Sequence, residues 1–226
     1  MRIAVLGTGM VGRALAGKLA ELGHDVTVGT RDVAATMART EPDGMGNPPY
    51  PTWAQAHPAV TLATFADAAA SAELIVNATS GNVSIAALEA AGRDNLTGKV
   101  LLDIANPLDH SQGFPPSLFV CNTNSLGEQI QAAFPQVTVV KALNTMNAFL
   151  MVDPWRLAGG DTSVFVSGND AGAKKTVTEL LVSFGHTDVI DLGDITTARG
   201  SEMLLAVWVR LYGALGTPMF TFKIVR

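Results

Sequence analysis

The chain is poor in charged residues and nearly lacks cysteine. Of its 226 residues, 15% are charged and 48% are hydrophobic, and Cys121 is the single cysteine. A lone cysteine excludes an intramolecular disulfide and a cysteine-rich metal site, and it is typical of a reducing compartment. The high apolar fraction excludes a disordered chain, because it supplies a large core. We therefore expect a folded, cytoplasmic protein.

The sequence also lacks the features of proteins that bind nucleic acids or membranes. Its net charge is −5 and it has no run of lysine and arginine, so it would repel a phosphate backbone. A strand-like pattern begins directly after Met1-Arg2, which leaves no room for a signal peptide. The longest apolar stretch, residues 203–220, is interrupted by Arg210 and resembles a buried or interfacial helix. We expect neither a nucleic acid nor a membrane as a partner.

Strand-like and helix-like segments alternate along most of the chain, which is typical of a parallel sheet with helices on both faces. We expect strands at residues 2–6, 25–29, 59–62, 74–77, 99–104, 137–141, 163–167 and 188–192, and helices at 10–22, 64–71, 83–91, from 124, at 171–184 and at 198–215. The predicted fold class is α/β, a doubly wound Rossmann-type, mainly parallel sheet extended by C-terminal strands and helices. Residues 1–226 are expected to form a single domain, with a nucleotide-binding core at 1–150 and an extension at 151–226.

Residues 32–58 break the alternation. Six proline and glycine residues between positions 42 and 51 disfavour regular structure. We expect a long loop with one helical turn, and loops of this length in compact domains are usually functional or mobile.

A glycine-rich turn follows the first strand. Gly7, Gly9 and Gly12 have the spacing that permits a tight turn, admits a pyrophosphate and lets the next helix pack closely. The spacing alone is a weak signal, but here an apolar strand precedes it and an amphipathic helix and second strand follow. We therefore expect Gly7, Thr8, Gly9, Met10, Val11 and Gly12 to bind a dinucleotide. The alternative is an ordinary strand-to-helix turn without a ligand.

The end of the second strand predicts which dinucleotide is bound. A site for NAD usually has an acidic residue there, which contacts the adenosine ribose, but this chain has Gly29-Thr30-Arg31. The Thr30 hydroxyl and the Arg31 guanidinium suit the 2′-phosphate of NADP, which a carboxylate would repel. Asp32 lies beyond the expected strand. We therefore predict NADP, with a solvated Arg31 as the alternative interpretation.

Several segments resemble one family, the deazaflavin (coenzyme F420)-dependent NADP reductases and their flavin-using relatives. The resemblance covers nearly the whole chain and is carried by residues 3–9, 29–32, 98–103 with Asn106-Pro107-Leu108, and 140–145. The last two segments are the more specific. The resemblance implies NADP as one cofactor, coenzyme F420 or a flavin as a second, and hydride transfer between them. The chain departs from the family in its long 32–58 loop and in the lack of a second basic residue directly after Asp32, for which Arg39 is a candidate substitute.

The segments that carry the resemblance also make chemical sense. They follow predicted strands, at the sheet edge where open α/β folds bind ligands. We expect cofactor contacts from Asn77, Ala78, Thr79 and Ser80 after the fourth strand, Asn106 and Pro107 after the fifth, and Ala142, Asn144 and Thr145 after the sixth. Ordinary turns and helix caps are the alternative for the asparagine and threonine residues. Lys141 is either an anion ligand or a snorkelling lysine, and we place it outside the site.

We predict no catalytic residue and no metal, because bound cofactors carry the chemistry of hydride transfer. His24, His57, His110 and His186 lack metal-ligand spacing and are interpreted as structural. Two alternatives stay open: an NADP-dependent dehydrogenase or reductase of a small carbonyl or imine, and a non-catalytic NADP sensor. The final predicted helix carries more apolar surface than one core face requires, at Leu204, Leu205, Val207, Trp208 and Leu211, which favours a homodimer.

Overall fold

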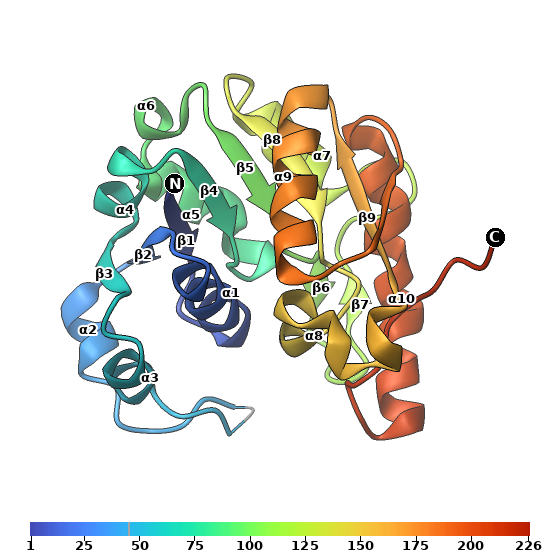
Figure 1. Cartoon of the computed structure of the whole chain (residues 1–226), viewed down its shortest axis with the longest axis horizontal. Coiled ribbons are helices and arrows are strands. Elements are labelled where there is room, and N and C mark those ends of the chain that lie inside the picture. The colour runs from blue at the N-terminus through green and yellow to red at the C-terminus, as the bar shows by residue number, and fades with distance from the viewer. Residues whose placement is uncertain (45) are drawn as a thin grey trace.

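A computed structural model of the chain, which describes residues 1–44 and 46–226, has one large sheet at its centre (Figure 1). The strand order is β10-β9-β8-β5-β4-β1-β2-β3. The strands are β1 (Arg2–Leu6), β2 (Asp25–Thr30), β3 (Thr61–Thr64), β4 (Leu74–Asn77), β5 (Val100–Asp103), β8 (Thr138–Ala142), β9 (Ser163–Gly168) and β10 (Asp188–Asp191). From β3 to β8 neighbouring strands pair in parallel, in the order of a Rossmann fold. The predicted fold class is confirmed.

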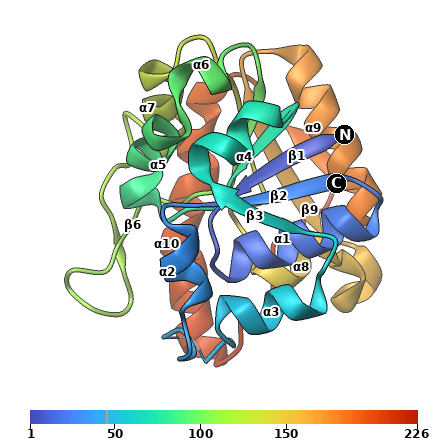
Figure 2. The same cartoon turned by 90° about the vertical axis from the view of Figure 1, so that its left-hand side faces the viewer.

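Helices cover both faces of the sheet (Figure 2). One face packs against α1 (Met10–Glu21), α8 (Ala148–Val152) and α9 (Ala171–Phe184), and the other against α4 (Phe65–Ser71), α5 (Ser84–Ala91), α6 (Arg93–Leu96), α7 (Leu126–Ala133) and the start of α10 (Ala198–Leu215). The alternation along β1 explains both cores, because Ile3 and Val5 belong to the first and Ala4 and Leu6 to the second. Short 3-10 helices are η1 (Gly81–Val83), η2 (Pro154–Arg156), η3 (Ala158–Gly160) and η4 (Ile195–Thr197).

The expectation of a long loop at residues 32–58 is wrong in its extent. The segment forms α2 (Val33–Met37) and α3 (Tyr50–Ala56). The Asp32 side chain caps α2 by accepting a hydrogen bond from the Ala35 N–H at 2.9 Å. A proline in the first turn begins α3, where its missing N–H has no intrahelical partner to lose. The prolines therefore begin a helix here instead of preventing one. Met45, within the expected loop, lies outside the described residues.

Residues 106–120 hold a small hairpin that the sequence did not predict. Strands β6 (Leu108–Asp109) and β7 (Ser117–Leu118) pair in antiparallel fashion. The connection between them projects from the body of the molecule below α5 (Figure 2). Because the hairpin follows β5 directly, it lies at the carboxyl-end edge of the sheet, beside any ligand bound there.

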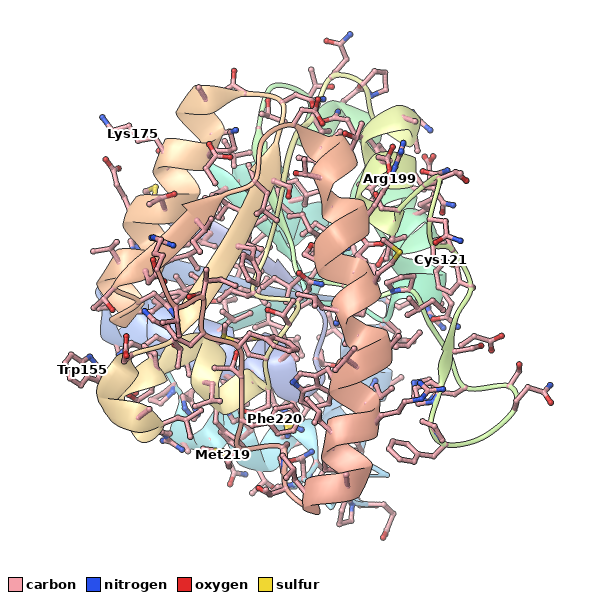
Figure 3. The ribbon with its side chains drawn as sticks, turned by 90° about the vertical axis from the view of Figure 1, so that its right-hand side faces the viewer. Cys121, Trp155, Lys175, Arg199, Met219 and Phe220 are labelled. Carbon is pink, nitrogen blue, oxygen red and sulfur yellow. The ribbon has the colours of Figure 1, made fainter. Side chains whose placement is uncertain are left out.

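The C-terminal part of the chain is joined to the core through the sheet. Strand β9 pairs with β8 in antiparallel fashion, and β10 pairs with β9. Helix α10 then runs along the side of the molecule, and Met219 and Phe220 of the following tail lie beside its C-terminal half (Figure 3). Within the described residues, no helix combines the length and the apolar character that crossing a membrane requires.

Candidate active site

The glycine turn between β1 and α1 has the geometry that its spacing predicts. Gly7 has a φ of +124°, and a Cβ placed on it would lie 2.6 Å from the carbonyl oxygen of Ala78. A Cβ on Gly12 would lie 2.1 Å from the carbonyl oxygen of Gly7. By contrast, a Cβ on Gly9 would have no described atom within 4 Å. Gly7 and Gly12 are thus required by packing, whereas Gly9 faces open space.

The N-terminus of α1 is available to bind an anion. Gly9 is its N-cap residue, and among the described residues no side chain caps the helix. Its first N–H groups and the positive end of the helix dipole therefore favour a phosphate group at this position. Met10 and Val11, in the first turn, are half-buried.

Basic residues stand at the far end of this turn, around a cleft of about 350 Å³ that we call the nucleotide cleft. Arg31 follows β2 and Arg39 follows α2, and both line the cleft. The Arg39 guanidinium donates a hydrogen bond of 3.1 Å to the Thr8 hydroxyl, which fixes it against the glycine turn. Asp32 also lines the cleft, and its carboxylate caps α2 through one oxygen. The cleft thus has the second basic group that the sequence lacked directly after Asp32.

Thr30 lies deeper than the sequence suggested. It is 5% exposed, and its hydroxyl shares a hydrogen bond of 2.8 Å with that of Thr36. Both residues line the nucleotide cleft. The threonine pair forms the floor of the cleft, while Arg31 and Arg39 supply its positive charge.

At the end of β4, one predicted site residue is buried and the next three line the nucleotide cleft. Asn77 is fully buried, donates hydrogen bonds to Asp103 at 2.8 Å and Ser84 at 3.1 Å, and accepts one from the Thr79 hydroxyl at 2.7 Å. Ala78, Thr79 and Ser80 line the nucleotide cleft. Asn77 therefore lies one residue behind the cleft, where it holds Thr79 in place.

A buried cluster of charges lies behind the site. The sheet register pairs Asn77 with Asp103 and Asp103 with Lys141, at the ends of β4, β5 and β8. The Lys141 ammonium lies 2.8 Å from the Asp103 carboxylate and 2.9 Å from that of Glu202 in α10, and it also donates to the Ala105 carbonyl oxygen. The lysine and aspartate side chains are 0% exposed. Lys141 is thus not a snorkelling lysine, and the anions that it binds are two buried carboxylates of the protein itself.

The charge state of the cluster follows from its partners. Burial by itself lowers the pKa of Lys141, but attraction to the Asp103 and Glu202 carboxylates outweighs burial and raises the pKa above its ordinary value. Glu202 in turn accepts hydrogen bonds from the backbone N–H groups of Leu126 at 2.7 Å and Gly127 at 3.0 Å, at the start of α7. The cluster therefore ties β5, β8, α7 and α10 together through charge-assisted hydrogen bonds.

Asn106 and Asn144 form a reciprocal pair between the ends of β5 and β8. The Asn106 amide donates to the Asn144 carbonyl oxygen at 3.0 Å, and the Asn144 amide donates to the Asn106 side-chain oxygen at 3.1 Å. The Asn144 amide also donates to the Ser201 carbonyl oxygen of α10 at 3.1 Å. Pro107, Ala142 and Thr145 are buried around this pair. The asparagines thus fix where the sheet edge meets α10.

An apolar cavity of about 590 Å³ opens beside this junction. Met10 and Val11 of α1 line it, as do Asn106 and Asn144. Its remaining walls are mainly apolar and come mostly from the hairpin, from α8 and the residues just before it, and from α10, including Leu108, Phe114, Met146, Phe149, Leu205, Trp208 and Tyr212. Gly9, the N-cap residue of α1, lines the nucleotide cleft, and the next two residues, Met10 and Val11, line the apolar cavity, so the two spaces lie beside consecutive residues of the chain.

Stacked aromatic rings form one wall of the apolar cavity. The ring of Trp208 lies 5.9 Å from that of Tyr212 and 5.1 Å from that of Phe220, both near parallel, and Tyr212 meets Phe114 edge to face at 5.8 Å. Figure 3 shows Phe220 next to α10. Rigid aromatic walls of this kind favour a flat, conjugated ligand.

The histidines occupy different environments. His186 is buried, donates from Nε2 to the Met151 carbonyl oxygen at 2.9 Å, and has a pKa lowered by burial. His57 stacks on Trp53 with a ring separation of 4.2 Å. His110, in contrast, is exposed and lines the apolar cavity. Among the described residues, no cluster of histidine, cysteine and acidic side chains could hold a metal ion.

Sequence reasoning missed several residues around the site. Asp103 carries a detectable signal, since it is a charged residue at the end of an apolar strand, next to Lys141, which the sequence placed outside the site. Gly81 has a weaker one: a Cβ on it would lie 2.0 Å from the Asn106 carbonyl oxygen, but only the structure brings these segments together. Glu202 and the aromatic residues of α10 lie far along the chain, and no local pattern connects them to the sheet edge.

The glycine turn, the basic cleft and the strand order together define the chain as a Rossmann-type dinucleotide-binding protein. Comparison with known proteins gives the family. The model of the coenzyme F420-dependent NADP oxidoreductase family matches residues 2–107. The structure of a candidate F420-dependent NADP-reductase from Arthrobacter sp. FB24 is 68% identical in sequence, with a TM-score of 0.96 and full coverage of both chains.

More distant structures share the fold. A hypothetical protein from Sinorhizobium meliloti is 22% identical with a TM-score of 0.63, over 87% of each chain. The reductive aminase of Aspergillus terreus, solved with NADPH, is 18% identical with a TM-score of 0.63; the match covers 95% of this chain but 62% of the aminase. No protein among those with curated functions is significantly similar. The chain belongs to the family of coenzyme F420-dependent NADP oxidoreductases.

Proposed function

We propose that the protein transfers hydride between NADPH and the deazaflavin ring of coenzyme F420. The observation that carries this proposal is that consecutive residues border the two spaces: Gly7 to Gly9 line the nucleotide cleft, and Met10 and Val11 line the apolar cavity. A dinucleotide whose pyrophosphate lies at the glycine turn would extend its nicotinamide toward a ring held in the apolar cavity. Such a reaction requires close stacking of donor and acceptor more than it requires a protein acid or base.

We assign NADP contacts to residues on both sides of the glycine turn. The proposed contacts are Gly7, Thr8, Gly9, Met10, Val11 and Gly12 for the pyrophosphate and ribose, Arg31 and Arg39 for the 2′-phosphate, with Thr30 beneath them, and Ala78, Thr79 and Ser80 for the nicotinamide half. We assign Asn106 and Asn144 to the second ring, since both line the apolar cavity. Asn77, Pro107, Ala142 and Thr145 hold these groups from behind, since all are buried.

The size and chemistry of the apolar cavity support a ring ligand. Its volume of about 590 Å³ lies in the ordinary range for ligand sites of about 300–1,000 Å³. Apolar side chains surround two asparagines that can meet ring carbonyl and N–H groups. The Trp208 indole N–H is buried beside this cavity and has no partner among the described residues, so the wall holds a further donor.

The test follows NADPH oxidation with several acceptors. Purified protein is mixed with NADPH and, in separate reactions, with oxidised coenzyme F420, FMN, FAD and a panel of small carbonyls and imines, and the loss of NADPH absorbance is recorded. We expect turnover with F420. Turnover with a carbonyl or imine alone would instead support the small-molecule reductase, and NADPH binding without any oxidation would support the sensor.

We further propose that residues 1–226 act as a single domain and assemble as a homodimer in the cytoplasm. The outer face of α10 supports the dimer, because Ala206, Val207, Leu211 and Ala214 border a shallow apolar groove of about 520 Å³ beside Arg210. Measurement of the mass in solution tests the dimer, and a monomeric mass at micromolar concentration would contradict it. Cell fractionation tests the location.

A further inference from the structure

The tail that follows α10, residues 216–226, lies across other parts of the fold. Pro218 lines the apolar cavity, and the side-chain amide of Asn147, the N-cap residue of α8, donates a hydrogen bond to its carbonyl oxygen. Further along, the Phe222 carbonyl oxygen accepts a hydrogen bond of 2.9 Å from the N–H of Ser163, the first residue of β9. The tail is therefore fixed both to the wall of the cavity and to the sheet.

A polar cluster fastens the tail to the outer strands; we call it the tail clasp, and it consists of Ser163, Asp188 and Lys223. Ser163 and Asp188 are paired at the starts of β9 and β10. The Ser163 hydroxyl donates to the Asp188 carboxylate at 2.6 Å and accepts from the Ile224 N–H at 2.9 Å. The Lys223 ammonium lies 3.3 Å from the Asp188 carboxylate, and the exposed Arg226 guanidinium lies 2.8 Å from it. Hydrogen bonds and opposite charges thus join the tail to the sheet.

Asp188 carries its charge in a partly buried setting. Its side chain is 14% exposed, against 63% for that of Arg226. The hydrogen bond from Ser163, and then pairing with Lys223 and Arg226, outweigh burial and lower the pKa of Asp188 below its ordinary value. The pKa of Lys223 is raised, because its ammonium pairs with Asp161 as well as with Asp188. Both groups are charged at neutral pH, and salt screens a partly buried pair less than an exposed one.

Between its two ends the tail supports the aromatic wall of the apolar cavity. The Phe220 ring lies 5.1 Å from that of Trp208 and near parallel to it, and Figure 3 shows Phe220 next to α10. Trp208 lines the cavity, whereas Phe220 is not among the described residues that line it. Met219 packs against the core on the α1, α8 and α9 side of the sheet. Phe220 thus holds Trp208 in place without itself facing the ligand.

The middle of the tail also contains a group that disfavours this arrangement. The Thr221 hydroxyl is buried and has no hydrogen-bond partner among the described residues. Burying a hydroxyl without a partner costs free energy, because its hydrogen bonds to water are lost. The contacts at the two ends of the tail must outweigh this cost, so the position of Phe220 depends on them.

We infer that Asp188 is a positioning residue for the second substrate. Its carboxylate holds the tail through the clasp, the tail holds Phe220 against Trp208, and Trp208 forms the wall on which the substrate ring packs. The inference rests on the proposed function. It adds a residue of β10, at the edge of the sheet, that is absent from the described linings of the nucleotide cleft and the apolar cavity.

The test measures the kinetics of Asp188→Ala with NADPH and coenzyme F420. We expect the KM for F420 to rise about fivefold, while kcat at saturating F420 and the KM for NADPH stay unchanged, since a looser wall weakens binding of the ring alone. Asp188→Glu keeps the carboxylate and should recover most of the wild-type KM. A purely structural role would lower kcat or change both KM values together.

A double-mutant cycle tests whether Asp188 acts through Phe220. Phe220→Ala by itself should raise the KM for F420 about tenfold, because Trp208 loses its stacking partner. If the clasp acts only by holding Phe220, the double variant should also show about a tenfold rise. Independent effects would multiply to about fiftyfold.

Asp191→Ala is the matched control. Asp191 ends the same strand, and its carboxylate pairs with Lys174 at 2.8 Å instead of with the tail. It should keep both KM values. Lys223→Ala approaches the clasp from the tail and should raise the KM for F420 in the same direction, and thermal melting checks that each variant is folded. Release of Phe220 should also shift the tryptophan emission to longer wavelength in Asp188→Ala but not in Asp191→Ala.

The outcomes separate this inference from the proposed function. A wild-type protein that does not turn over F420 would contradict the proposed function, and the KM comparison is then made with the acceptor that reacts, because the inference concerns the wall of the cavity. Absence of turnover with every acceptor would overturn both. Turnover of F420 with equal KM in wild type and Asp188→Ala would overturn the inference alone. Multiplied effects in the double variant, or an unchanged emission, would do the same, since Asp188 would then act without Phe220.

Discussion

The nucleotide cleft and the apolar cavity adjoin each other but are built in opposite ways. The cleft is lined by residues from positions 7 to 80, in short segments at the ends of β1, β2 and β4, in and after α2, and at the start of α4. The apolar cavity is lined by residues from position 10 to position 218, contributed by α1, the hairpin, α8, α10 and the tail. The first is thus specified by local sequence, whereas the second exists only when distant parts of the chain have packed together.

The two regions also differ in the forces that shape them. In the cleft, backbone geometry and positive charge dominate, through Gly7, Gly12, Arg31 and Arg39. Around the apolar cavity, buried charges and stacked rings hold α10 against the sheet edge. Substitutions in the cleft should therefore change NADPH binding selectively, and substitutions behind the cavity should change stability and the second substrate together.

The largest effect is expected for Lys141→Met, which removes the cation of the buried cluster. Asp103 and Glu202 would be left without their shared partner, and breaking a buried pair in this way costs about 3–5 kcal/mol. We expect the free energy of unfolding, measured with urea, to fall by this amount. The KM for the second substrate should rise more than that for NADPH, because the cluster positions α10.

The pH dependence of the same variant gives a second measurement. The folded state raises the pKa of Lys141 above 10.5, so the cluster stabilises the protein fully below that pH and loses this contribution as the pH rises through the folded pKa. The stability difference between wild type and Lys141→Met should therefore shrink in strongly alkaline solution. A stability difference that stays constant in alkaline solution would contradict a stabilising role of the Lys141 charge.

Gly12→Ala and Gly9→Ala should separate packing from ligand approach within the cleft. The Cβ at position 12 would meet a backbone oxygen at 2.1 Å, so we expect a lower melting temperature and NADPH binding weakened by about a hundredfold, or about 2.7 kcal/mol. Gly9→Ala should melt like the wild type and still bind NADPH poorly. Calorimetric titration and thermal melting measure both, and equal melting temperatures for the two variants would contradict the assignment.

Arg31→Ala tests whether the cleft selects NADP through its 2′-phosphate. Loss of a charge-assisted pair should raise the KM for NADPH by about tenfold and leave the KM for NADH nearly unchanged. Arg226→Ala, an exposed arginine that pairs with Asp188 at the end of the chain, is the control. Equal effects of Arg31→Ala on the two nucleotides would show that Arg31 does not contact the phosphate.

The smallest effect is expected for Phe149→Ala, at the edge of the apolar cavity. Phe149 lines the cavity and is 42% exposed. Loss of its ring should raise the KM for F420 by about fivefold, or about 1 kcal/mol of aromatic contact, while the KM for NADPH stays the same. Val182→Ala, an exposed residue of α9, should change neither. If only the KM for NADPH changed, Phe149 would contact the nucleotide and not the ring in the apolar cavity.

Much of the fold can be predicted from patterns that extend over few residues. The apolar strands and the glycine turn predicted the sheet, and the helices α9 and α10 lie where their periodicity indicated. The segment 32–58 was interpreted incorrectly, because its prolines were taken to prevent helices. In the structure Asp32 caps the start of α2, and prolines stand at the start of α3. The hairpin after β5 was missed because its strands are too short to show an alternation.

The sequence by itself determined the Rossmann core, the glycine turn and the basic residues after the second strand, since each depends on neighbours within one strand-turn-helix unit. It also pointed to the family, through short segments after the strands. Only the tertiary structure decided that Lys141 is enclosed by Asp103 and Glu202, that Arg39 reaches Thr8, and that α10 and the hairpin both line the apolar cavity. The reason is physical: these contacts join residues far apart in the chain, and their energies exist only after the core has brought them together.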